Sequence, residues 1–162
     1  MSDAIETLRR MPAQVAEVLA GLPPEARSWK PSPRQFSILE NVAHLHDLER
    51  KGYLVRLRRT LEEETPLLPD LDGDRMAIER RYNSRDLEVE LAAFAEARAE
   101  TVALLARTLA AMRTRRARLE KVGEVTFDRL IEMLIEHDRG HLEEITTLRK
   151  SWPDASGSLP RN

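Results

Sequence analysis

The chain has 162 residues, enough for a single domain that buries a proper core. It contains no cysteine, which excludes a disulfide framework, a cysteine zinc site and a thiol nucleophile. Its 26 basic and 28 acidic residues give a net charge of −2, whereas nucleic-acid-binding proteins usually carry a clear basic excess. Six glycines and 4% aromatic residues predict an all-α protein rather than a sheet protein. Because no apolar run is long enough for a membrane span and the start lacks a signal-peptide core, we expect a cytoplasmic protein with no membrane partner.

Two amphipathic helices are predicted in the N-terminal part of the chain. The first covers residues 3–21, where apolar residues recur at steps of three and four. Ser32 is the expected N-cap of the second helix, because Pro33 would then occupy the first helical position and Gln35 would complete a capping box. We expect this second helix to run to about Glu64.

Residues 65–82 are rich in proline and aspartate and predict a loop. A loop of this length is unusual inside a compact domain and needs a structural reason. Extended at up to ~3.3 Å per residue, it reaches ~60 Å, more than the ~45 Å length of a thirty-residue helix. We therefore expect a long crossover that joins two parallel helices.

The third and fourth helices follow this crossover. The third is expected to begin at a cap provided by Asn83 or Ser84 and to carry apolar residues along one face as far as Met112. The fourth is expected to start after Thr126 and to continue to about Trp152. Four amphipathic helices predict a four-helix bundle.

The remaining segments define the domain organisation. Residues 113–124 form a basic connector; such runs are usually solvated, and the absence of interleaved aromatic residues argues against a nucleic-acid partner. Trp29, in the connector between the first two helices, is expected to plug one end of the bundle. We expect a single domain over residues 1–152, followed by a flexible tail over residues 153–162 that is rich in serine, glycine and proline.

Two of the four histidines, His137 and His141, lie four residues apart in the fourth predicted helix. This spacing places two imidazoles on one face at neighbouring turns, as in helical zinc motifs. Both histidines continue the apolar line of the helix, so they are expected to face the bundle interior, where a shared metal ion would satisfy them. The alternative is a pair of ordinary core histidines that are hydrogen-bonded to carboxylates such as Glu136 or Glu144.

The other two histidines, His44 and His46, lie in the second predicted helix. A histidine on a facing helix would complete a metal site, because bundle cores assemble such sites from side chains of several helices. Both residues flank the apolar stripe of their helix, and periodicity does not choose between them.

Three stretches of the chain match a known pattern in order and spacing. They are the segment from Trp29 to Glu49 with its His44-Leu-His-Asp47 sequence, the Phe94-Ala-Glu-Ala-Arg98 stretch, and Gly123-Glu-Val-Thr-Phe127 followed by His137-Asp-Arg-Gly-His141. With these motifs the sequence resembles the DinB/YfiT-like superfamily of four-helix metalloenzymes. The likeness extends over most of the chain between Trp29 and Leu148.

The resemblance implies a bundle in which His44, His137 and His141 hold a divalent metal ion, whereas His46 takes no part. Zinc or nickel suits imidazole ligands. The superfamily includes hydrolase-like members and transferases that use a low-molecular-weight thiol, so we expect an enzyme that acts on a small molecule by thiol-dependent transfer or metal-assisted hydrolysis. Relatives of this kind often form homodimers. One departure is Glu144, which stands where relatives often have glutamine.

Coordination chemistry supports this expectation. Three neutral imidazoles leave at least one position open on the ion, which can lower the pKa of a bound water to about 7 or bind a thiol as thiolate. The alternative from another class is a non-catalytic, stress-associated scaffold that uses the metal ion only to stabilise the bundle.

Arg98 is the second functional candidate, because it interrupts an apolar series in the third predicted helix. A guanidinium there is costly unless it meets a carboxylate, a carbonyl or a bound anion. The functional interpretation is a catalytic pocket arginine that holds a substrate carboxylate or orients an acidic side chain behind the metal ligands. The structural interpretation is a paired or snorkelling arginine.

Five further residues are weaker candidates. Carboxylates often accept the second N–H of a ligand histidine, and tyrosines can donate protons. The carboxylates are Glu40, Asp47 and Asp138, and the tyrosines are Tyr53 and Tyr82. In a chain with 33% charged residues, solvated carboxylates and packed tyrosines are the simpler interpretation.

Overall fold

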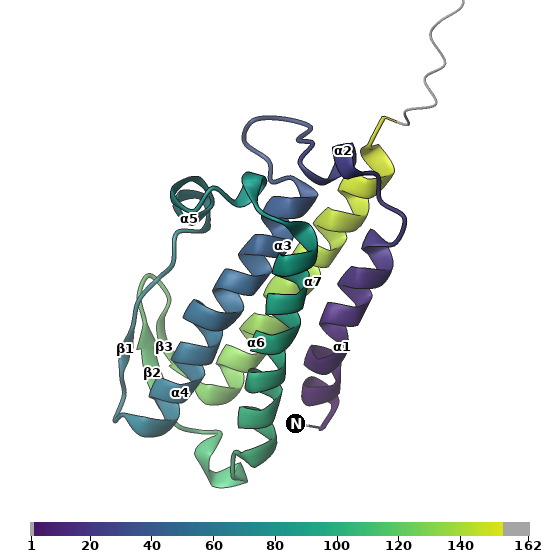
Figure 1. The fold of residues 1–162 in the computed structure, drawn as a ribbon. Coiled ribbons are helices and arrows are strands. Elements are labelled where there is room, and N and C mark those ends of the chain that lie inside the picture. Colours follow the sequence, from purple (N-terminus) through teal and green to yellow (C-terminus); the bar gives the residue numbers. More distant parts are fainter. Residues whose placement is uncertain (1, 154–162) are drawn as a thin grey trace, which may run out of the picture.

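Four long helical segments lie side by side in the computed structural model, which describes residues 2–153 (Figure 1). The helices are α1 (Ser2–Leu19), α2 (Pro24–Arg27), α3 (Ile38–Asp47), α4 (Leu54–Glu62), α5 (Gly73–Glu79), α6 (Leu87–Arg107) and α7 (Phe127–Ser151). The strands are β1 (Leu67–Leu68), β2 (Arg116–Leu119) and β3 (Gly123–Thr126). Apart from Pro153, the predicted tail 153–162 lies outside the described residues.

The direction of the helices confirms the predicted four-helix bundle with a long crossover. Helices α1 and α7 run in one direction, whereas α3 with α4 and then α6 run in the other (Figure 1). The segment between α4 and α6 therefore returns along the bundle and connects two parallel helices. It is not a plain loop, because it contains β1, α5 and a short 3-10 turn over Tyr82–Ser84.

The second long helix begins later than the sequence predicted. Ser37, and not Ser32, is its N-cap: the Ser37 side chain accepts a hydrogen bond from the Glu40 amide at 3.0 Å. The Glu40 carboxylate in turn accepts one from the Ser37 amide at 2.8 Å, which completes a capping box. The predicted box of Ser32 and Gln35 is instead a local turn, closed by a 3.2 Å backbone hydrogen bond.

The third long helix also differs at both ends from the prediction. Asp86 caps α6 by accepting a hydrogen bond from the Val89 amide at 2.9 Å, so neither Asn83 nor Ser84 is the cap. The negative charge of an aspartate in this position also interacts favourably with the positive end of the helix dipole. The helix ends at Arg107, and the predicted extension to Met112 is wrong because that residue belongs to a separate 3-10 turn.

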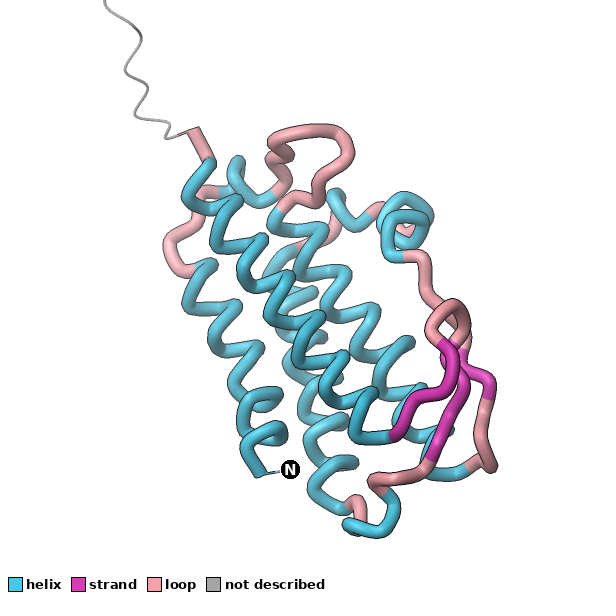
Figure 2. The backbone as a smooth tube through the Cα atoms, turned by 180° about the vertical axis from the view of Figure 1, so that it is seen from behind, coloured by secondary structure: helices cyan, strands magenta, loops and turns pink. Residues whose placement is uncertain are grey.

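The predicted basic connector 113–124 forms most of a β-hairpin. Strand β2 pairs antiparallel with β3 and parallel with β1, which gives the sheet order β1-β2-β3. Its residues alternate between exposed arginine and buried Ala117 and Leu119, the pattern of a half-buried strand. The connection has a positive φ at Lys121 and at Gly123, where glycine carries no steric cost. The sheet covers one flank of the bundle (Figure 2).

A π-helical turn over Leu48–Tyr53 joins α3 and α4 into one continuous helix. Such turns insert an extra residue into a helix and often occur at functional sites. Here the turn carries two buried residues. Glu49 pairs with Arg98, and the ring of Tyr53 lies beside that of His137.

The predicted plug at one end of the bundle is a pair of tryptophans. The ring of Trp29 packs edge-on against that of Trp152, with 5.5 Å between the ring centroids. Both rings lie against the apolar cluster that contains Val15, Val42 and Phe94. This cluster fills the bundle at the end where α3 and α6 begin.

Candidate metal centre

The three histidines that the sequence singled out lie together in the structure. His44 comes from α3, and His137 and His141 come from successive turns of α7. One nitrogen of each ring can be chosen so that all three lie within 4.8 Å of one another. The Nε2 atoms of His44 and His137 are 3.1 Å apart, and the rings of His137 and His141 lie 4.5 Å apart between centroids.

These distances fit the donor set of a metal ion. Nitrogens at 2.0–2.1 Å from a tetrahedral zinc ion lie about 3.3 Å from one another. The Nδ1 atoms of His44 and His137 are buried and have no hydrogen-bond partner in the described part of the chain. When these Nδ1 atoms carry the ring protons, the two Nε2 atoms that face each other both offer lone pairs to a shared cation. The residues present therefore fit a divalent metal.

The surroundings of His44 and His141 favour the uncharged form of both rings. Burial, and to a lesser extent the proximity of His137, lowers the pKa of His44 to about 3. Burial and the two neighbouring histidines lower the pKa of His141 to about 2. Neutral imidazole is the form that binds metal ions, so these two side chains need not release a proton to bind one.

Asn41 orients one of these rings and was not predicted from the sequence. Its Oδ1 lies 2.6 Å from Nδ1 of His141, and its Nδ2 donates to the Ser37 carbonyl at 3.0 Å. Because the amide is fixed by Ser37, the oxygen faces the histidine and accepts its N–H. The Nε2 atom of His141 is then left with a lone pair that faces the cluster. The only sequence signal is that Asn41 precedes His44 by three residues and shares its helix face.

Gly73 is a second residue that sequence analysis missed. It begins α5 in the crossover, and a Cβ atom built there would lie 2.6 Å from Cε1 of the His44 ring. This is closer than real contacts allow, so only glycine leaves room for the ring in its present position. The crossover thus touches the candidate metal centre directly.

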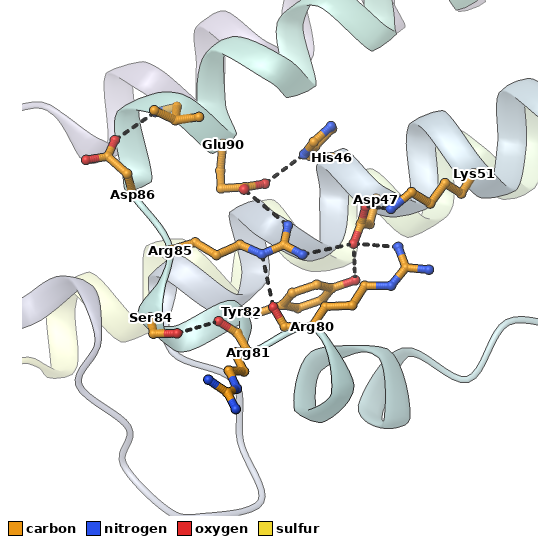
Figure 3. Close-up of polar contacts among 11 residues, drawn as sticks. His46, Asp47, Lys51, Arg80, Arg81, Tyr82, Ser84, Arg85, Asp86 and Glu90 are labelled. Atoms are coloured by element: carbon orange, nitrogen blue, oxygen red, sulfur yellow. Dashed lines mark hydrogen bonds and ion pairs between the residues drawn. The ribbon is translucent and has the colours of Figure 1, made fainter.

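His46 takes no part in the cluster, as expected. Its Nδ1 lies 2.7 Å from the carboxylate of Glu90 on α6 (Figure 3). That carboxylate also accepts a hydrogen bond from Arg85 at 3.1 Å. His46 therefore belongs to a polar network on another side of α3.

The same network occupies Asp47 and Tyr82. The Asp47 carboxylate accepts hydrogen bonds from the Tyr82 hydroxyl at 2.8 Å and from Lys51 at 2.7 Å, and pairs with Arg80 at 2.8 Å (Figure 3). Burial and the hydrogen bond to Asp47 raise the pKa of Tyr82 above its ordinary value. These contacts tie the end of the crossover to α3, and neither residue lines the cavity of the histidines.

The other predicted carboxylates do not hydrogen-bond to a histidine ring in the described structure. Glu40 serves the capping box and pairs with Lys30 at 2.8 Å. The Oδ1 atom of Asp138 lies 3.8 Å from Nδ1 of His137, too far for a hydrogen bond. The oxygen that accepts from a candidate ligand is thus the amide of Asn41.

Arg98 lies behind the centre and is not among the residues that line its cavity. It donates to Asp138 and to Glu49, each at 2.7 Å, and to the Leu8 carbonyl at 3.1 Å. All three charged side chains are at most 1% exposed. Arg98 is therefore a buried, paired arginine outside this cavity, and one of its two carboxylate partners, Asp138, adjoins His137 in the chain.

A cavity of about 540 Å³ opens beside the histidines. The side chains of His137 and His141 remain 21% and 17% exposed, so solvent reaches the centre from this side. Tyr53 lines the wall, with its ring 5.7 Å from that of His137, and burial raises its pKa to about 12. Glu144 also lines it, and its carboxylate lies 3.9 Å from Nδ1 of His141. Burial raises the pKa of Glu144 above its usual value.

The basic run near the sheet is largely paired within the chain. Arg113 pairs with Asp128 at 2.8 Å, Arg116 with Glu124, and Lys121 with Asp70 at 2.7 Å. Arg115 donates to two backbone carbonyls. These contacts give the run a structural role.

None of the helices in residues 2–153 has the length and apolarity needed to span a bilayer.

Comparisons with known proteins agree with this geometry. The sequence pattern of the DinB superfamily matches residues 7–145. The fold matches that of YfiT from Bacillus subtilis, described as a "probable metal-dependent hydrolase with an unusual four-helix bundle topology", with a TM-score of 0.85 and 21% identity. The match covers 94% of this chain and 88% of YfiT. No curated protein matches the chain. Because the pattern covers most of its length, this chain belongs to the DinB superfamily.

Proposed function

We propose that this protein is a metal-dependent enzyme that binds a divalent ion, zinc or nickel, through His44, His137 and His141 and acts on a small molecule. The observation that carries the proposal is the convergence of three imidazoles at the wall of a solvent-accessible cavity. A bundle that used the ion for stability alone would have no need of a cavity next to it.

The chain's own residues prepare this site. A divalent ion supplies Lewis acidity there, which lowers the pKa of a bound water or thiol. Asn41 fixes the tautomer and orientation of His141 by accepting its N–H. Tyr53 keeps its proton up to high pH and is placed to donate a hydrogen bond to a molecule in the cavity. The Glu144 carboxylate is placed to accept a proton from the same molecule.

The reaction class is thiol-dependent transfer or metal-assisted hydrolysis. The description of YfiT supports hydrolysis, and the resemblance to the superfamily implies both classes. Cobalt substitution separates them, because the visible spectrum of the cobalt protein responds to a new ligand. We expect a low-molecular-weight thiol such as 2-mercaptoethanol to change the spectrum if the enzyme is a thiol transferase. A spectrum that ignores thiols, together with turnover of simple esters or amides, assigns a hydrolase.

Metal content tests the proposal itself. We expect about one divalent ion per chain in the wild-type protein and a loss of that ion in His44→Ala, His137→Ala and His141→Ala. His46→Ala is the matched control, since it removes a histidine two residues from His44 that pairs with Glu90 instead. Metal binding that survives all three substitutions would overturn the proposed centre. A bound ion whose coordination sphere is closed by four protein ligands would support the non-catalytic scaffold.

A further inference from the structure

We propose that Arg56 forms an anion-binding subsite in the histidine cavity and selects substrates that carry a carboxylate. This inference deepens the proposed function, because it takes the cavity beside the three histidines as the substrate site. It rests on the surroundings of one buried cation that the metal centre does not use.

Arg56 is buried but lacks a counter-charge. The residue is 6% exposed and lines the cavity. Its Nη2 donates to the Pro69 carbonyl at 2.9 Å, while its Nε is buried without a hydrogen-bond partner. It forms no ion pair with a carboxylate within residues 2–153, and Asp70 acts on it only at longer range. A buried guanidinium in this condition is costly, and a bound anion would remove that cost.

The other buried arginine shows how the same fold neutralises such a charge. Arg98 is 1% exposed and contacts two carboxylates, Glu49 and Asp138, at 2.7 Å each. Among the described residues, the Arg56 guanidinium hydrogen-bonds to a neutral carbonyl and lies over the face of Tyr53, 5.4 Å from the ring centroid. The difference between the two sites is the counter-charge: two carboxylates neutralise Arg98, whereas Arg56 lines the histidine cavity with no carboxylate paired to it within residues 2–153.

A purely structural role for Arg56 would be to hold the crossover, but a neighbouring arginine already does this. Arg59, one turn further along α4, donates to the Leu67 carbonyl at 2.9 Å and is neutralised by Glu63 at 2.6 Å. One further hydrogen bond to Pro69 does not explain why a charged group is buried at a cavity wall. A neutral donor would serve there at lower cost.

The surroundings favour a carboxylate over a more highly charged anion. The cavity is also lined by the exposed Arg34 and by four acidic residues, which repel a dianion more strongly than a monoanion: Asp70, Asp72, Asp74 and Glu144. A single guanidinium balances one negative charge, and its planar fork matches the two oxygens of a carboxylate.

The spacing relates this subsite to the metal centre. The Tyr53 ring neighbours both groups, 5.4 Å from the guanidinium carbon of Arg56 and 5.7 Å from the His137 ring. A molecule whose carboxylate contacts Arg56 can therefore place a reacting group beside the histidines when only a few bonds separate the two groups. The substrate class is thus a short organic acid.

The test compares an acid with its isosteric amide. Binding of 3-phenylpropionate and 3-phenylpropanamide to the full chain is measured by calorimetry or NMR, once with metal bound and once after chelation. We expect the wild-type protein to prefer the acid at least tenfold in both forms. Arg56→Gln is expected to abolish the preference, and Arg56→Lys to retain part of it. Arg58→Gln, at an exposed arginine of the same helix that pairs with Glu100 and does not line the cavity, is the matched control and is expected to keep the preference.

The outcomes separate this proposal from the metal centre. Equal binding of acid and amide, binding of neither, or a preference that Arg56→Gln leaves unchanged would overturn the subsite. A preference confined to the metal-bound protein and insensitive to Arg56→Gln would place the carboxylate on the ion, which also overturns it. Because the chelated protein is included, loss of the three-histidine proposal would leave a positive result intact. If Arg56→Gln fails to fold, the comparison of wild type with Arg56→Lys decides.

Discussion

The Nδ1 atom of His141 on α7 lies 2.6 Å from the side-chain oxygen of Asn41 on α3, and this contact links two residues that are 100 positions apart in sequence. It leaves the other ring nitrogen of His141 free to face His44 and His137. We therefore expect Asn41→Ala to lower metal affinity about 10- to 100-fold, measured by competition with a chelator. Gln14→Ala removes an exposed amide side chain on α1, away from the cluster, and serves as control. An unchanged affinity in Asn41→Ala would show that the contact does not orient the ligand.

Gly73 controls the position of the His44 ring from the crossover. Gly73→Ala places a methyl group 2.6 Å from the ring and is expected to lower metal affinity roughly tenfold or more. Gly140→Ala is the control, because a Cβ atom there meets nothing within 4 Å and alanine favours the helix by about 1 kcal/mol. Chelator competition and thermal unfolding measure both effects. If the two variants bind metal equally well, the crossover does not constrain the site.

Arg98 neutralises Glu49 and Asp138 in the interior. Arg98→Leu leaves both carboxylates buried without their partner, and we expect a loss of about 3–5 kcal/mol in the free energy of unfolding. Metal affinity is expected to fall as well, because Asp138 adjoins His137. Urea unfolding and chelator competition measure the two effects. A variant that is more stable and binds metal normally would refute any link between this cluster and the centre.

Asp47 makes the attachment of the crossover dependent on pH. Burial alone would raise its pKa, but hydrogen bonds from Lys51, Arg80 and Tyr82 outweigh it and hold the pKa at about 2. Because this lies below the ordinary value of 3.8, the ionised carboxylate stabilises the fold above pH ~4. That contribution, about 2 kcal/mol, is lost as the pH falls through 2.

The corresponding measurement is urea unfolding of wild type and Asp47→Asn at several pH values. We expect the variant to be less stable at pH 7 and the difference to shrink between pH 4 and pH 2. Glu96→Gln, on the exposed face of α6, is expected to show no such trend. A stability difference that is constant down to pH 2 would contradict this account.

The histidine cluster could be predicted from the sequence because two of its three members lie close together in the chain. The spacing of His137 and His141 fixes their common face on one helix, and resemblance to a known pattern selected His44 over His46. Asn41 and Gly73 contact the cluster through side-chain packing between distant segments, which no spacing along the chain encodes. Arg98 was recognised as unusual in an apolar series, but its two carboxylate partners come from other helices.

For the fold, the four long helices and the crossover between parallel helices were predicted correctly. The errors lie at helix ends, in the sheet and in the short helices α2 and α5, which were not predicted. Ser32 and Ser37 both offer a capping pattern, and the reciprocal bonds of Ser37 with Glu40 determine the choice. The hairpin was hidden because arginines dominate its exposed face, while Ala117 and Leu119 on the buried face are few. Short strands of this kind depend on packing against the bundle, not on local propensity.

X-ray absorption spectroscopy of the protein loaded with zinc or nickel tests the central claim most directly. We predict three imidazole nitrogens at about 2.0–2.1 Å and at least one further light-atom ligand that exchanges with solvent or an added thiol. Fewer than three imidazoles, or a shell closed by protein carboxylates such as Glu144, would contradict the proposed three-histidine centre with an open position.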